Sequence, residues 1–292
     1  MTAAAEVREL LARHGLHARH ALGQHFLIDD RVYERIVAEV RAAADDWIVE
    51  IGAGLGTLTR RLCAVVPRGR VVALERDARL HAVIEAAAAE GLPLEPWRGD
   101  AVRFDLAALA RRAPRPLLVV GNLPYQISSP ILGQLEAAHG IVTRAVFMLQ
   151  REVAERLAAA PDSEEYGQLS VMLAQHFDIT LVRRVGARAF LPPPRVESAL
   201  VRLETRAAPR VAVADEGHLR RVVKAAFGQR RKTLRNALAA AAPRPAVEAA
   251  LAAVAIEGQR RGETLSLEEF GRLADALGPA AGWGPTADRG SA

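Results

Sequence analysis

The 292-residue sequence predicts an α/β fold with a mainly parallel sheet, followed by a smaller C-terminal all-helical domain. Apolar strand-like runs alternate with helical patterns from residue 29 to about 205, which is typical of βαβ units. Ala207, Ala208 and Pro209 resemble a linker, and beyond Asp215 the pattern is helical throughout. The expected segments are an N-terminal arm (1–28), an α/β domain (29–206), a helical domain (207–278) and a flexible tail (279–292).

The predicted strands are short apolar runs bounded by charged or turn-forming residues. The first covers 47–51 and leads directly into a glycine-rich turn, and the second covers 70–75. A further candidate strand ends at Gly99 and Asp100. The remaining strands are expected over 117–121, 144–149, 179–185 and 199–203.

Helices are predicted where apolar residues recur at three- and four-residue spacing. Asp29 or Asp30 can cap the first of those in the α/β domain. The next two are expected to begin near Thr57 and to lie between residues 77 and 91. In the C-terminal domain, Ser266 followed three residues later by glutamate has the spacing of a capping box, which predicts the start of the last helix.

Composition excludes several classes of protein. The single cysteine, Cys63, cannot form an intramolecular disulfide framework, and charged side chains interrupt the first twenty residues, where an export signal would need an apolar core. The sequence has no run of about 18 apolar residues, so we expect no membrane-spanning helix. We therefore expect a cytoplasmic protein. We expect no metal, because His, Cys and carboxylates do not occur together at metal-ligand spacing.

A glycine-rich loop, Gly52-Ala53-Gly54-Leu55-Gly56, follows the first strand and opens a helix. Glycines there let the backbone approach a ligand at the carboxyl end of the sheet. Glu75 ends the next strand 21 positions after Gly54, close to the offset of an acid that accepts ribose hydroxyls. Asp100 ends the following strand, where its carboxylate can accept a hydrogen bond from an adenine amino group.

The spacing of these glycines selects among nucleoside cofactors. The loop has the form G-x-G-x-G and lacks the G-x-G-x-x-G spacing of a dinucleotide site. This favours S-adenosylmethionine, which has a ribose and an adenine but no phosphate, over a nicotinamide cofactor. The fold class is then a Rossmann-like S-adenosylmethionine-dependent methyltransferase sheet with a C-terminal helical domain.

Asn122-Leu123-Pro124-Tyr125 follows another strand and suits methylation of a base amino group. The lone pair of that nitrogen is delocalised into the ring. Two acceptors, the Asn122 side-chain oxygen and the Leu123 carbonyl, would draw the nitrogen toward tetrahedral geometry. Pro124 stiffens the turn, and the Tyr125 ring offers a stacking surface for an extruded base. No strong general base is needed, because the proton can leave after the nitrogen has become cationic.

These motifs, taken in order, resemble the ribosomal RNA adenine dimethyltransferase family, and most closely its bacterial small-subunit branch. The resemblance runs from about Leu22 to Leu277. The matching motifs cover 22–27, 49–56, 122–128, 147–153, 166–171, 190–199 and 229–236.

The resemblance implies dimethylation of the amino groups of two adjacent adenines near the 3′ end of 16S rRNA, coupled to late assembly of the small subunit. It also implies that the N-terminal arm closes over the cofactor. The cofactor-binding residues that it implies are His25, Leu27, Gly52, Gly54, Glu75, Asp100 and Asn122. The implied catalytic residues are Asn122, Leu123, Pro124, Tyr125 and Phe190, with Phe190 stacking on the target base opposite Tyr125.

Two positions depart from the common family pattern. His25 and Gln126 each stand where many relatives have asparagine. At His25 a backbone contact with the cofactor survives the change, whereas a side-chain contact is in question, and a plain loop histidine is the alternative interpretation.

The net charge of +5 is unevenly distributed. The segment 217–247 carries eight of the 39 Lys and Arg residues and none of the 34 Asp and Glu residues, so it is +8 and the remainder is −3. This concentration predicts contacts with RNA phosphates. The predicted RNA-binding residues are Arg220, Arg221, Lys224, Arg230, Arg231, Lys232 and Arg235.

The sequence leaves three alternative functions to be weighed. A large-subunit rRNA adenine methylase of the antibiotic-resistance type shares the cofactor and Asn-x-Pro-Tyr motifs, but the triple proline at 192–194 favours the small-subunit branch. A non-catalytic assembly factor would not need the Asn122 motif. A DNA adenine methylase usually has aspartate at the position of Asn122. We expect a monomer whose partner is the small ribosomal subunit or its precursor.

Overall fold

The computed structural model describes residues 1–18, 23–229 and 231–279. The chain forms two units, the first from Met1–Ala154 with Phe177–Thr205 and the second from Glu155–His176 with Arg206–Ala292. The division at Arg206 lies beside the predicted linker. The predicted tail, apart from residue 279, lies outside the described residues.

The continuous α/β domain predicted over 29–206 is corrected by the segment Glu155–His176, which folds with the helical unit. Val171 and Met172 of this segment are buried in the same apolar core as Leu219 and Phe270. The sequence pattern did not reveal this, because an apolar helix between two strands is compatible with packing on the sheet.

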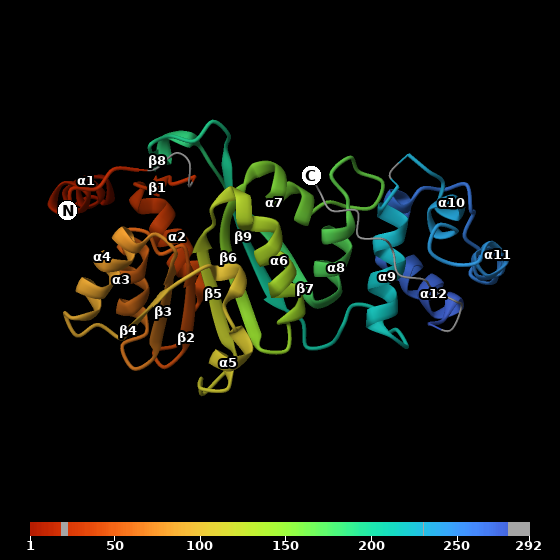
Figure 1. Cartoon of the computed structure of the whole chain (residues 1–292), viewed down its shortest axis with the longest axis horizontal. Coiled ribbons are helices and arrows are strands. Elements are labelled where there is room, and N and C mark those ends of the chain that lie inside the picture. The colour runs from red at the N-terminus through yellow and green to blue at the C-terminus, as the bar shows by residue number, and fades with distance from the viewer. Residues whose placement is uncertain (19–22, 230, 280–292) are drawn as a thin grey trace. The chain divides into compact units, whose positions relative to one another are not determined.

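A seven-stranded sheet with the order β4-β3-β2-β5-β6-β9-β7 forms the centre of the first unit (Figure 1). Its strands are β2 (Trp47–Ile51), β3 (Arg70–Glu75), β4 (Leu94–Arg98), β5 (Leu117–Asn122), β6 (Val142–Gln150), β7 (Phe177–Val185) and β9 (Ser198–Thr205). The strands from β4 to β6 are parallel, whereas β9 runs antiparallel to both β6 and β7. The predicted mainly parallel sheet is confirmed.

Local sequence determines where the helices of this unit begin. Asp29 caps α2 by accepting hydrogen bonds from the backbone N–H groups of Arg31 and Val32, and Asp77 caps α4 in the same way. The helices are α1 (Ala3–Arg13), α2 (Asp30–Val40), α3 (Thr57–Val65), α4 (Ala78–Ala88), α5 (Leu106–Ala110) and α6 (Ser128–Ala137), and α7 (Arg151–Leu157) spans the division between the units.

A second, two-stranded sheet ties the N-terminal arm to the carboxyl end of the large sheet. Its antiparallel strands are β1 (Phe26–Leu27) and β8 (Phe190–Leu191), which lie side by side in Figure 1. Helix α1 packs Val7 and Leu10 into an apolar cluster with Phe26, Leu55 and Leu80. The sequence did not predict this sheet, because each strand has only two residues.

The second unit is helical and has its own apolar core. Its remaining helices are α8 (Gln168–His176), α9 (Glu216–Phe227), α10 (Leu234–Leu238), α11 (Arg244–Ala253) and α12 (Leu267–Leu277). The predicted capping box at the start of α12 is confirmed by reciprocal hydrogen bonds between Ser266 and Glu269. Within the part of the chain that the structure describes, no helix combines the length and apolar character needed to cross a membrane.

Candidate active site

A cavity of about 470 Å³ opens at the carboxyl ends of β2, β3 and β5, within the range of small-molecule sites. It brings together every residue that the sequence analysis proposed for the cofactor and for the chemistry. These residues are His25, Leu27, Gly52, Gly54, Glu75, Asp100, Asn122, Leu123, Pro124, Tyr125 and Phe190.

The glycine-rich loop has the backbone conformation that its sequence requires. Gly52, Gly54 and Gly56 have φ angles of 74°, 60° and 76°, in the left-handed region that a side chain disfavours. A Cβ atom on Gly52 would lie 3.5 Å from the Cδ atom of Pro124. The loop therefore borders the Asn122 to Tyr125 turn closely.

Glu75 is buried at the end of β3. Its two carboxylate oxygens accept hydrogen bonds from the backbone N–H groups of Gly54 at 2.9 Å and Asp77 at 2.8 Å. Burial raises the pKa of Glu75, and these two hydrogen bonds oppose that shift. An ionised carboxylate has about four acceptor positions, so Glu75 keeps capacity to accept a ribose hydroxyl while these backbone hydrogen bonds remain.

Asp100 lies on the same wall of the cavity, after β4. One carboxylate oxygen accepts a hydrogen bond from the Val102 N–H at 3.0 Å. The other lies 4.0 Å from the Arg76 guanidinium. An oxygen of this group is available to accept a hydrogen bond from an amino group of a ligand.

Glu50 is a cavity residue to which the sequence analysis gave no role. It is 1% exposed, and no described residue is a hydrogen-bond partner of its Oε2 atom. Burial raises the pKa of Glu50 to about 8. The signal was visible in Glu50-Ile51-Gly52, an acid at the end of a buried strand. Together with Glu75 it makes the cavity suited to a cationic ligand such as the sulfonium and ammonium groups of S-adenosylmethionine.

Asn122 ends β5 and connects the turn to the N-terminal arm. Its Nδ2 atom donates a hydrogen bond to the main-chain carbonyl of His25 at 3.0 Å. The next residue, Leu123, is buried and donates its N–H to the carbonyl of Met148 at 3.2 Å. The Pro124 carbonyl accepts from Ile127 at 3.0 Å. Three hydrogen bonds therefore fix the conformation of the turn.

Two aromatic rings border the cavity in different surroundings. Tyr125 is half-buried, and its hydroxyl is hydrogen bonded to the Ser198 hydroxyl at 2.9 Å. The rings of Tyr125 and His25 are 6.2 Å apart and inclined by 27°. Phe190 is only 2% exposed, because its strand pairs with Leu27 of the arm. Tyr125 thus offers the more open ring.

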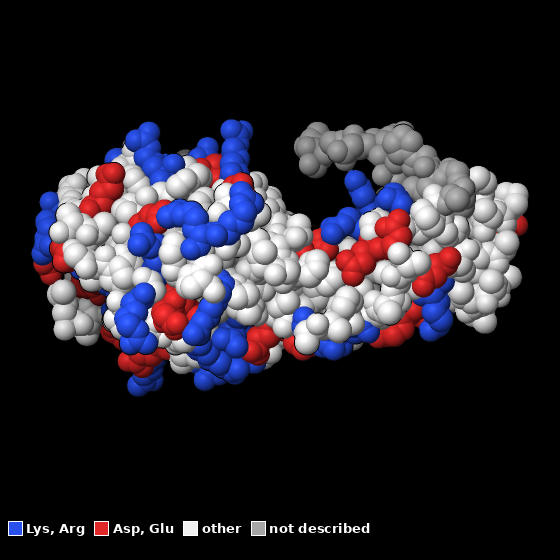
Figure 2. Space-filling view, turned by 90° about the horizontal axis from the view of Figure 1, so that it is seen from below, with Lys and Arg blue, Asp and Glu red and all other residues white. Residues whose placement is uncertain are grey.

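The predicted RNA-binding residues lie in the second unit. Arg220, Arg221 and Lys224 are exposed on α9, Arg231 and Lys232 are exposed after it, Arg235 is half-buried in α10, and Arg230 lies outside the described residues. Acidic side chains from outside the segment 217–247 lie close to some of its basic residues, so the charge around the segment is more mixed than its sequence indicates. Arg221 lies 3.6 Å from Asp215, and Arg244 lies 3.1 Å from Glu248. On the face that Figure 2 shows, acidic and basic side chains of this unit lie next to each other.

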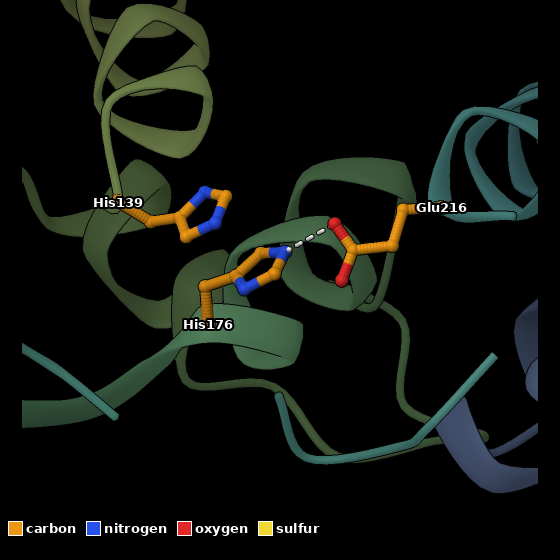
Figure 3. Close-up of side chains that lie close together, drawn as sticks. All are labelled: His139, His176 and Glu216. Carbon is orange, nitrogen blue, oxygen red and sulfur yellow. Dashed lines mark ion pairs between the residues drawn. The ribbon is translucent and has the colours of Figure 1, made fainter. Parts of the chain in front are cut away.

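The second unit also contains a buried histidine that pairs with a carboxylate. His176 Nε2 lies 3.4 Å from Glu216 Oε2 (Figure 3). The expected absence of a metal stays a prediction.

The fold and the cavity together define the class of protein. A glycine-rich turn after β2, a buried acid at the end of β3 and an Asn-Leu-Pro-Tyr turn at the end of β5 are typical of α/β methyltransferases that modify amino groups. The chain belongs to the ribosomal RNA adenine dimethylase family, whose sequence model matches residues 15–277. It is therefore an S-adenosylmethionine-dependent enzyme that dimethylates adenine in rRNA.

Curated relatives match nearly the whole chain. A ribosomal RNA small subunit methyltransferase A from Anaeromyxobacter dehalogenans is 47% identical over 284 residues, covering 93% of this chain and 97% of the relative. The protein of the same name from Myxococcus xanthus is 44% identical over 275 residues, covering 93% and 95% of the two chains.

Two solved structures are also similar. A dimethyladenosine transferase from Plasmodium falciparum has a TM-score of 0.72 at 24% identity, covering 85% of this chain and 96% of that chain. The 23S rRNA methyltransferase ErmE has a TM-score of 0.65 at 28% identity, covering 86% and 99%. The predicted fold class is confirmed.

Proposed function

We propose that the enzyme acts on the small ribosomal subunit or its assembly precursor, where it dimethylates two adjacent adenines near the 3′ end of 16S rRNA. The observation that carries this proposal is the identity of 44–47% to small-subunit methyltransferases over 93% of the chain. The large-subunit enzyme ErmE shares only 28%. The large-subunit alternative is therefore the weaker one.

We assign the cofactor-binding roles from the cavity walls. Glu75 accepts the two ribose hydroxyls, Asp100 accepts the adenine amino group, and the glycine loop leaves room for the methionine portion. Glu50, protonated in the ligand-free protein because burial raises its pKa to about 8, would release its proton when the cationic ligand binds and so balance that charge. When bound, S-adenosylmethionine supplies a methyl group activated by a sulfonium centre. Leu27 and His25 of the arm close the cavity on its other side.

Asn122 and Leu123 prepare the adenine nitrogen for methyl transfer. The Asn122 amide nitrogen donates to His25, so the Oδ1 atom is the acceptor presented to the substrate. With the Leu123 carbonyl it accepts the two amino hydrogens, which weakens conjugation of the nitrogen with the ring and directs its lone pair toward the methyl donor. The proton leaves after the nitrogen has become cationic, so no strong base is required of the chain.

The target adenine enters the cavity between the rings that border it. Tyr125, fixed through Ser198, supplies the stacking surface. Phe190 provides the opposite apolar wall and is held there by the pairing of β1 and β8. Both rings are fixed before substrate arrives, which lowers the entropic cost of orienting the base.

We infer that the basic residues of the second unit dock the ribosomal particle. Arg220, Lys224, Arg231 and Lys232 are exposed and suit phosphate contacts that position RNA without reading its bases. The substrate further implies a cytoplasmic enzyme that acts during late assembly of the small subunit, and we propose that it works as a monomer without a metal.

Mapping the products tests this proposal. Small subunits isolated from cells without this modification are incubated with the enzyme and S-adenosylmethionine, and their RNA is digested for nucleoside analysis. We expect N6,N6-dimethyladenosine at two adjacent positions near the 3′ end of 16S rRNA. Binding to the particle without any methylated adenine would instead support a non-catalytic assembly factor.

A further inference from the structure

His25 makes two hydrogen bonds to residues other than Glu75 and Asp100, the two acids assigned to the cofactor. Its ring Nδ1 atom lies 2.8 Å from the main-chain carbonyl oxygen of Pro192. Its own carbonyl oxygen accepts the hydrogen bond from Asn122 Nδ2 at 3.0 Å. One residue of the arm thus contacts both the loop after β8 and the catalytic amide.

These contacts fix the roles of the atoms involved. A carbonyl oxygen only accepts hydrogen bonds, so the Nδ1 atom of His25 carries the proton that it shares with Pro192. For the same reason the nitrogen of the Asn122 amide, and not its oxygen, must face the His25 carbonyl. The direction of the Asn122 oxygen therefore depends on where the arm holds that carbonyl.

We propose that His25 is a positioning residue for catalysis: its ring anchors the arm to Pro192, and its carbonyl thereby orients the Asn122 amide toward the adenine. This inference rests on the proposed role of Asn122. It gives the histidine that replaces the family asparagine a function of its own, distinct from covering the cofactor. Closure of the arm then completes the catalytic site as well as the cofactor site.

Other residues of the arm form hydrogen bonds with residues near the proposed cofactor-binding walls. Gln24 donates to the Asp77 carboxylate at 3.1 Å, beside the ribose-binding Glu75. The Leu27 carbonyl accepts from the Tyr33 hydroxyl at 2.8 Å. The arm is therefore attached to Asp77 and Tyr33 as well as to Pro192, and the Gln24 and His25 contacts can be removed one at a time.

The test compares His25→Leu with His25→Asn in steady-state kinetics on unmethylated small subunits. Leucine removes the donor to Pro192, whereas asparagine carries an N–H donor at the same distance from the backbone as histidine Nδ1. For His25→Leu we expect kcat to fall about tenfold, the effect of one hydrogen bond of this kind, with KM for S-adenosylmethionine nearly unchanged. His25→Asn is expected to restore most of kcat.

Gln24→Ala is the matched control, because it loosens the same arm at the cofactor end. We expect it to raise KM for S-adenosylmethionine several-fold and to leave kcat close to that of the wild type. Thermal unfolding and binding of S-adenosylmethionine by each variant show whether it is folded, and a misfolded His25→Leu is replaced by His25→Phe, which also lacks the donor.

The proposal is overturned if removing the donor at residue 25 raises KM with kcat unchanged, leaves both constants unchanged, or lowers a kcat that asparagine does not restore. Failure of the proposed function has a different signature, because the wild-type enzyme would then not methylate small subunits at all.

Discussion

Asn122 contacts the N-terminal arm and is the residue that we propose to contact both cofactor and substrate. It ends β5 beside the glycine loop, and its amide is held by the carbonyl of His25. Its proposed contribution is electrostatic and geometric, since an acceptor fixed in advance costs no reorganisation during methyl transfer. The residue is therefore expected to matter for turnover far more than for folding.

Asn122→Ala tests this role. We expect kcat to fall on the order of 100-fold to 1,000-fold. The adenine amino nitrogen that receives the methyl group would lose a hydrogen-bond acceptor that the protein holds in place in advance. Binding of S-adenosylmethionine, followed by calorimetry, should remain measurable. Retained turnover would remove Asn122 from the mechanism.

Glu50 gives the ligand-free protein a characteristic pH dependence. Its pKa is near 8 in the folded protein, above its ordinary value of about 4.3 in an unfolded chain. Between these values the unfolded chain binds fewer protons than the folded one, so stability falls as pH rises, with a limiting slope of roughly 1.4 kcal/mol per pH unit. Glu75 shifts in the same direction.

Glu50→Gln should flatten this fall. Denaturant unfolding of ligand-free wild type and variant at pH 5, 6, 7 and 8 measures it, with the variant gaining relative stability toward pH 8. Parallel curves for the two proteins would show that the Glu50 carboxyl does not titrate in this range.

At the scale of elements, periodicity predicted the long strands and the capped helices well. β2 and β3 have the predicted bounds, and the box at Ser266 is present. The pairing of β1 with β8 was missed because each strand has two residues and its partner is 164 positions away. The link from His25 to Pro192 was missed because it joins residues 167 positions apart, whereas Glu50 lies inside the predicted strand 47–51 and was only given no role.

The basic segment after α9 makes a testable contribution to docking. In the double variant Arg231→Ala, Lys232→Ala we expect weaker binding to small subunits and a log–log salt slope smaller by about 1.5, as for two lost phosphate contacts. Arg244→Ala is the matched control, because Arg244 is already paired with Glu248 and should change the slope little. Filter binding at several salt concentrations measures both, and an unchanged slope in the double variant would count against this RNA-docking role.

At the scale of the whole molecule, the helical unit includes a segment inserted between β6 and β7. Helix α8 shares its core with α9 and α12. Folding of α8 should therefore depend on the helical core and not on the sheet, although α8 lies between two strands in the sequence.

Phe270→Ala tests this organisation. The side chain is fully buried in the helical core, and its loss should cost about 3–5 kcal/mol. Hydrogen exchange should then accelerate in both α8 and α9 while β5 keeps its protection. Phe147→Ala in β6 is the matched control and should have the opposite pattern. Protection of α8 that follows β5 would place the division of the chain elsewhere.

One of the two units of the chain contains a segment in which basic residues are concentrated. The segment 217–247 is +8 and the rest of the chain is −3, so the proposed docking surface lies in the unit that does not contain the cavity. A docking unit and a catalytic unit on one chain suit a substrate much larger than the adenine that is modified. We then expect docking on the ribosomal subunit, more than recognition of the adenine itself, to determine which RNA is modified.

The most direct measurement supplies the enzyme and labelled S-adenosylmethionine with unmethylated small and large ribosomal subunits in parallel reactions. We predict label in the RNA of small subunits, as dimethylated adenine, and none above background in large subunits. Label confined to large-subunit RNA would contradict the assignment.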